Sequence, residues 1–290
     1  MRPLLARLAP AALAVALVAS CANLPPEPRH QAELAFPWGT ASGATVEEAA
    51  GLGRMVETAR SSLTAYEGFE DDPLRIHMVE RIGDHEDIAG VRVSSGDDAY
   101  VLIERGASNV PQTVAHELVH HYFHRLFDAF PGVVEEGTCV YLGDRVVPDP
   151  GARRRRLMPV ALGYLDEFTL EVSGTSAKAT LPELLRAAPT LPELLELDSN
   201  QLSAADRHAR NLGYGLGLIL VERIGFPGLV ALAERTRRAG RERVPLAELL
   251  EAARLEAPLG ESLERAILEA LGLDVRRGRQ KLTLRLESAD

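Results

Sequence analysis

The sequence predicts an α+β protein in which a small N-terminal sheet is followed by a mostly helical remainder. Residues 46–66 carry apolar side chains at steps of three and four, which is the pattern of an amphipathic helix. Short apolar runs broken by polar turns then indicate strands. These runs lie at 74–79, 89–93 and 99–104. We therefore expect a sheet lobe over residues 43–107 and a helical lobe over residues 108–290.

The first 20 residues have the organisation of a bacterial signal peptide. Arg2 and Arg7 give a positively charged start, and residues 8–20 form an apolar run too short to cross a bilayer comfortably. The run ends in Val-Ala-Ser-Cys, which resembles the bacterial lipobox, where cleavage precedes a cysteine that then carries a lipid. We expect Cys21 to be lipidated and to hold the mature protein on a membrane of the cell envelope. An ordinary secretory signal and an uncleaved anchor are the alternatives.

Residues 21–42 are expected to be a tether between the lipid and the folded domain, because proline recurs through them. The prolines are Pro25, Pro26, Pro28 and Pro37. Ala22, rather than an aspartate, follows the cysteine, and this favours the outer membrane of a Gram-negative cell.

The composition excludes some functions. The net charge of −10 argues against nucleic acid as a partner. With Cys21 lipidated, Cys139 is the one remaining thiol, so no internal disulfide can form, and a small core residue is its expected role. The run from Arg153 to Arg156 is expected to be a solvated face, with contact to anionic lipid as the alternative. The alternating run 281–286 predicts a terminal strand or an exposed tail.

The segment from His116 to His120 reads His-Glu-Leu-Val-His and lies on a predicted helix. Asn109 is expected to cap this helix, and Pro111 falls in its first turn, where the missing N–H costs little. Histidines four residues apart lie about 6 Å apart along the axis and about 40° around it, so both can reach one metal ion. Glu117 lies at the edge of the same site. This arrangement is that of zinc hydrolases, in which the carboxylate takes a proton from water activated by Zn²⁺.

Residues 131–141 read Pro-Gly-Val-Val-Glu-Glu-Gly-Thr-Cys-Val-Tyr and are expected to form a second helix antiparallel to the first. Together with the preceding motif they resemble the gluzincin metallopeptidases of the peptidase MA-like group, in which His-Glu-x-x-His is followed by Pro-x-Trp-Leu-x-Glu-Gly-x-Ala. The resemblance is specific over residues 110–144 and looser to about residue 271. It implies that Glu136 is the third zinc ligand, with Gly137 as the small residue behind it. The chain departs from the family segment at Val133, Val134 and Cys139.

Other side chains near the motif are weaker candidates. His124 lies about 12 Å along the helix axis from His116, too far to share an ion with it, and His121 points off the face. Glu135 is the alternative to Glu136 as third ligand. Asp144 is a candidate to orient a ligand histidine, with a surface role as the simpler interpretation.

The resemblance also implies a zincin-like fold with the active-site cleft between the two lobes. By the same likeness, the strand at 99–103 would bind the substrate backbone by strand addition. Residues 210–224 resemble the family helix that carries a tyrosine among small residues, and Tyr214 would donate its hydroxyl to the oxyanion. A core tyrosine is the alternative, and His208 and Arg210 are weaker candidates for the same role. Close helix packing is predicted by Gly213, Gly215 and Gly217.

The sequence thus predicts a lipid-anchored, zinc-dependent peptidase acting on peptide or protein substrates in the cell envelope. The alternative is a non-catalytic zincin-fold lipoprotein that serves as a binding or envelope-assembly factor. Glu117 argues against this alternative, because a purely structural zinc site has no use for that carboxylate. A third interpretation, a chance motif, predicts no stoichiometric zinc.

Overall fold

A computed structural model describes residues 32–82, 89–95, 98–148, 153, 157, 167–172, 175–180, 191–205, 207–255, 266 and 282–286. The expected signal peptide, Cys21 and residues 154–156 of the arginine run lie outside the described residues. The chain divides into two compact units. Unit 1 comprises Met1–Leu63 and Glu70–Tyr122, and unit 2 comprises Thr64–Phe69 and Phe123–Asp290. A five-stranded mixed sheet together with several helices agrees with the predicted α+β class.

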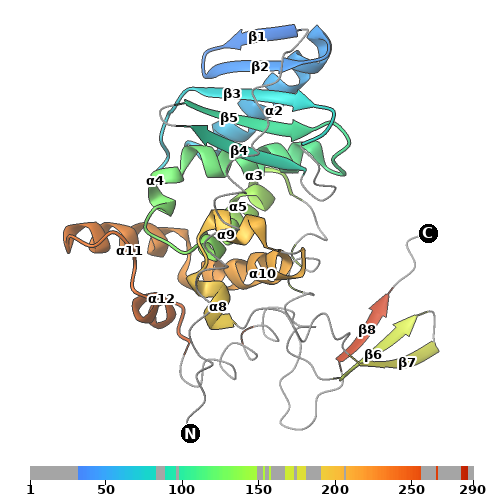
Figure 1. Ribbon diagram of the computed structural model, residues 1–290, viewed down its shortest axis with the longest axis vertical. Coiled ribbons are helices and arrows are strands. Elements are labelled where there is room, and N and C mark those ends of the chain that lie inside the picture. The colour runs from blue at the N-terminus through green and yellow to red at the C-terminus, as the bar shows by residue number, and fades with distance from the viewer. Residues whose placement is uncertain are drawn as a thin grey trace, which may run out of the picture. The chain divides into compact units, whose positions relative to one another are not determined.

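Unit 1 is built on the five-stranded sheet, whose strands lie in the order β1-β2-β3-β5-β4 (Figure 1). The strands are β1 (Ala32–Phe36), β2 (Gly39–Gly43), β3 (Leu74–Val79), β4 (Gly90–Ser95) and β5 (Asp98–Glu104). The outer pairs β1/β2 and β4/β5 are antiparallel, whereas β2/β3 and β3/β5 are parallel. The three strands predicted from apolar runs are therefore β3, β4 and β5.

The hairpin of β1 and β2 lies inside the segment that the prolines led us to expect as a tether. Pro37 occupies the turn between the two strands, a position that suits its fixed φ. Phe36 stacks on Trp38 with ring centroids 4.9 Å apart, and its ring lies directly against Gly53. Residues 32–42 therefore belong to the sheet, because their apolar side chains are packed, and a tether can extend no further than residue 31.

Two helices, α2 (Val46–Leu63) and α3 (Val110–Tyr122), cover one face of this sheet. α2 contacts β1, β2, β3 and α3, and α3 contacts β4 and β5. Gly90 of β4 lies against α3 and pairs with Ile103 of β5, so the face that carries Ile103 is the covered one. The other face carries a smaller apolar cluster of Ile82, Val93, Tyr100 and Leu102.

The predicted start of α3 is confirmed, but its predicted end is wrong. The backbone N–H of Gln112 donates to Oδ1 of Asn109 at 3.3 Å, so Asn109 caps the helix as expected. We expected His124 to lie on the same helix as His116. Instead α3 ends at Tyr122, whose carbonyl accepts from the N–H of Glu70 at 2.9 Å, and Phe123 leaves the helical region with φ −122° and ψ 16°. Residues 124–127 form the separate short helix α4 (His124–Phe127).

The end of α3 gives a testable pH dependence. Burial raises the pKa of Tyr122 to about 12, and Arg60 offsets part of this rise. This folded-state pKa lies above the ordinary value near 10. The contribution of neutral Tyr122 to the free energy of unfolding is therefore fully present below pH 10, and up to roughly 2.7 kcal/mol of it is lost between about pH 10 and 12. Tyr122→Phe should therefore flatten the fall in unfolding free energy over that range, measured by urea denaturation. An equally steep fall in both proteins would contradict the prediction.

Unit 2 is mostly helical, with a three-stranded sheet of order β7-β6-β8. Its other helices are α5 (Gly132–Val146), α8 (Leu191–Glu196), α9 (Ser199–Ala204), α10 (Arg207–Ile224), α11 (Phe226–Arg238) and α12 (Leu246–Ala252). Its strands are β6 (Glu167–Val172), β7 (Thr175–Thr180) and β8 (Leu282–Leu286), the last being the alternating run near the C-terminus. In the described part of the chain no single helix is long and apolar enough to cross a membrane. Among the described residues, one pair of helices passes the same test together, on length and composition alone. It joins Leu212–Ile224 of α10 to Phe226–Arg238 of α11, with a bend of 89° between them.

The helices α5 and α10 touch backbone to backbone. A Cβ atom at Gly137 would lie 2.1 Å from the carbonyl carbon of Gly217, and one at Gly217 would lie 1.7 Å from the carbonyl oxygen of Val133. Real Cβ atoms do not approach so closely, so both positions require glycine. The close packing predicted from the glycines of α10 is confirmed at Gly217, and also at Gly213, which lies against Leu202.

Candidate metal centre

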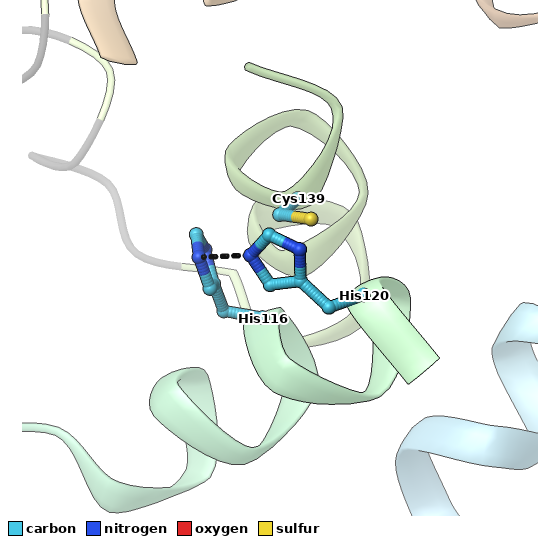
Figure 2. Close-up of side chains that lie close together, drawn as sticks. All are labelled: His116, His120 and Cys139. Carbon is cyan, nitrogen blue, oxygen red and sulfur yellow. Dashed lines mark hydrogen bonds between the residues drawn. The ribbon is translucent and has the colours of Figure 1, made fainter. Parts of the chain in front are cut away.

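Helix α3 brings the two motif histidines together on one face. The Nε2 atoms of His116 and His120 lie 3.2 Å apart, shown by the dashed line in Figure 2. Their ring centroids are 5.0 Å apart and the rings are inclined at 67°. His120 is 8% exposed and His116 is half-buried, so the two nitrogens meet at a partly dry site.

This separation fits two ligands of one tetrahedral metal ion. With Zn–N bonds of about 2.0–2.1 Å, the edge of the coordination tetrahedron is about 3.3 Å. A direct hydrogen bond between one protonated and one unprotonated Nε2 has a similar length, so the geometry suits the histidine pair both with and without an ion. The two nitrogens are therefore spaced so that one metal ion could take both as ligands, and zinc as that metal stays a prediction.

Glu117 lies on the same helix and is directed toward strand β4. It is only 6% exposed. A Cβ atom built on Gly90 would lie 2.8 Å from Cγ and 2.9 Å from Oε1 of Glu117, so the carboxyl group packs against the backbone at the start of β4. Glu117 is thus a buried residue on the same helix as the histidine pair, and its role as general base stays a prediction.

The neighbouring histidines lie elsewhere, as the sequence suggested. His121 is buried, and its Nε2 lies 3.3 Å from the carbonyl oxygen of Asp72, away from the pair formed by His116 and His120. His124 is on α4, which the break at Phe123 separates from α3. Neither histidine shares a helix face with the pair.

The expected third ligand lies on α5, in unit 2. Glu136 is 3% exposed, whereas Glu135 and Asp144 are half-buried. The second predicted helix is confirmed, because α5 spans the whole segment that carries these residues. Coordination by Glu136, with Glu135 as its alternative, stays a prediction, and so does a supporting role for Asp144.

Cys139 is a further donor that sequence reasoning treated only as a core residue. It is fully buried and forms no disulfide, which confirms the expected burial. It stands three residues after Glu136, so the two side chains share one face of α5. Figure 2 draws Cys139 with the histidines. Thiolate is a strong zinc ligand, so the sequence alone could have indicated Cys139 as a candidate metal ligand.

The remaining predicted residues lie on or beside α10. Tyr214 and Arg210 are half-buried on this helix, and His208 belongs to it with a side chain outside the described residues. The oxyanion role of Tyr214 stays a prediction. Arg153 of the arginine run forms an ion pair with Glu222, with contacts of 2.7 and 2.9 Å, on the exposed surface.

The strand expected to bind substrate is not available for pairing. β5 is hydrogen-bonded to β3 on one side and to β4 on the other, so it has no open edge for strand addition. The sequence order suggested β5 because it is the last strand before α3. Among the described strands β4 pairs with β5 alone, and β4 is therefore the open edge beside α3.

Comparisons with protein-family models, with curated proteins and with solved structures found no match for this chain. A functional assignment therefore depends on the chemistry and geometry of the side chains described above.

Proposed function

We propose that this protein is a zinc-dependent peptidase of the gluzincin type, with a zincin-like fold, held at the bacterial cell envelope by a lipid on Cys21. One observation carries the proposal. The Nε2 atoms of His116 and His120 are separated by 3.2 Å, the spacing that one tetrahedral ion requires, and the buried Glu117 stands next to them in the chain.

In this proposal His116, His120 and Glu136 hold the zinc ion. When bound, zinc supplies a Lewis acid that polarises the substrate carbonyl and lowers the pKa of water. Glu117 then acts as general base: its carboxylate accepts the proton of the attacking water and returns a proton to the leaving amine. Tyr214 donates its hydroxyl to the oxygen that gains negative charge.

The substrate class follows from the sheet. An extended peptide can add to the open edge of β4 through main-chain hydrogen bonds, which do not depend on side-chain identity. Gly90, where β4 begins, packs against Glu117, so a peptide on this edge would run past the general base. We therefore propose extended or unfolded polypeptides of the cell envelope as substrates.

Metal removal tests the proposal. The purified mature protein should contain one zinc ion per chain and should cleave an unfolded protein such as reduced casein. A chelator should abolish cleavage, and stoichiometric zinc should restore it, because no other group replaces the Lewis acid. Mass spectrometry of the metal and gel analysis of the substrate provide the two measurements.

The outcomes separate the three interpretations. Bound zinc without cleavage of any unfolded substrate would favour the non-catalytic binding or assembly factor. Absence of stoichiometric zinc after purification and zinc loading would leave only the chance motif.

A further inference from the structure

Gly90 makes an unusually close contact with the proposed general base. A Cβ atom at this position would lie 2.8 Å from Cγ and 2.9 Å from Oε1 of Glu117, and 2.7 Å from Cγ2 of Thr113. Contacts below 3.0 Å are essentially absent from real structures, so a side chain at position 90 forces one of the neighbours to move. From this geometry we infer that Gly90 is a positioning residue, which holds the Glu117 carboxylate in place by leaving it room against β4.

Strand β4, Thr113 and Glu117 would all be crowded by a side chain at position 90. The first two cannot move easily. Strand β4 is fixed by its pairing with β5, where Gly90 lies opposite Ile103 and the N–H of Glu104 donates to the carbonyl of Ala89 at 2.8 Å. Thr113 is β-branched and therefore stiff, and its hydroxyl donates to the carbonyl of Asn109 at 3.1 Å, which fixes the direction of its methyl group.

Glu117 is the part that yields. Its Cγ and carboxyl group lie on rotatable side-chain bonds, so rotation about these bonds relieves the contact without a shift of the α3 backbone. An added methyl at position 90 should therefore displace the carboxylate while α3 and the histidine pair stay in place. A displacement of about 1 Å at a reacting group can reduce a rate about 100-fold.

This inference rests on the proposed function, because Glu117 matters to a rate only if the protein hydrolyses a substrate. The test is Gly90→Ala in the full mature chain, with casein as substrate. We expect kcat to fall about 10- to 100-fold, with KM within twofold and with unchanged zinc content. Gly51→Ala is the matched control, since a Cβ atom there meets nothing closer than 3.9 Å, and it should leave all these quantities unchanged.

A second variant separates the two contacts. Thr113→Ser removes the methyl group 2.7 Å from the added Cβ atom but leaves Glu117 as it is. If Glu117 is the affected residue, the double variant Gly90→Ala/Thr113→Ser should stay as slow as Gly90→Ala. Full recovery of kcat in the double variant would show that the Thr113 contact matters instead, and would overturn the inference.

A crystal structure of Gly90→Ala without metal gives a readout that does not depend on activity. It should show the Glu117 carboxylate shifted by about 1 Å or more, with the His116 and His120 rings unmoved, and the melting temperature should stay close to that of the parent. An unshifted carboxylate, loss of zinc, or a parent-like kcat would each overturn the role of Gly90. If the parent itself cleaves nothing, the proposed function fails, whereas the crystal structure still decides whether Gly90 positions Glu117.

Discussion

Replacing Glu117 with glutamine should slow peptide hydrolysis by about 10²- to 10⁴-fold while zinc stays bound. The amide has nearly the shape of the carboxyl group but cannot accept the proton of the attacking water. General-base catalysis contributes about 10²- to 10⁴-fold, so the expected loss in kcat is of that size. Zinc content should not change, because the separation of 3.2 Å between the His116 and His120 nitrogens is a property of the helix and does not involve Glu117.

The measurement is the rate of casein cleavage alongside zinc content by mass spectrometry. Glu234→Gln provides the matched control, because Glu234 is a partly exposed residue of α11 that pairs with Arg238 one helical turn later. It should retain full activity. Undiminished cleavage by Glu117→Gln would remove Glu117 as the base, and a simultaneous loss of zinc would show that its side chain supports the ligands instead.

The local parts of the candidate site could be predicted from the sequence because short-range chemistry determines them. The capping of α3 by Asn109 involves residues three apart, and the approach of His116 and His120 follows from the helical repeat. The close contact between α5 and α10 was also accessible, since glycines in a helix are unfavourable unless another backbone packs against them.

The parts that could not be predicted depend on pairing between distant segments. Apolar runs located β4 and β5 but contain nothing that decides which of them lies at the edge, and the sheet order placed β5 inside. The same pairing brings Gly90 to Glu117, a contact without any local signal in the sequence. The end of α3 at Tyr122 likewise depends on a hydrogen bond from Glu70, while the apolar spacing continues unbroken into α4.

The sequence does not decide which side chain is the third ligand, because Glu136 and Cys139 are both metal donors and share one face of α5. Glu136 is expected from the family resemblance, whereas Cys139 is favoured by the affinity of thiolate for zinc. Both are buried, so burial alone does not decide between them. Zinc affinity of single variants can distinguish them, since loss of a ligand should weaken binding by more than the roughly 10- to 100-fold that outer-sphere partners contribute.

We expect His120→Ala to lose stoichiometric zinc altogether, because removing one of the two motif imidazoles leaves no pair to begin the site. Glu136→Gln should weaken zinc binding more than 100-fold, and Cys139→Ser should bind zinc as the parent does. His124→Ala serves as the control for removing a nearby histidine, since His124 lies on α4 beyond the break in the helix. Competition with a chromogenic chelator measures all four affinities.

The reverse order, with Cys139→Ser impaired and Glu136→Gln intact, would replace the carboxylate by a thiolate. That result would overturn Glu136 as the third ligand but leave the peptidase proposal standing, because thiolates also hold catalytic zinc ions.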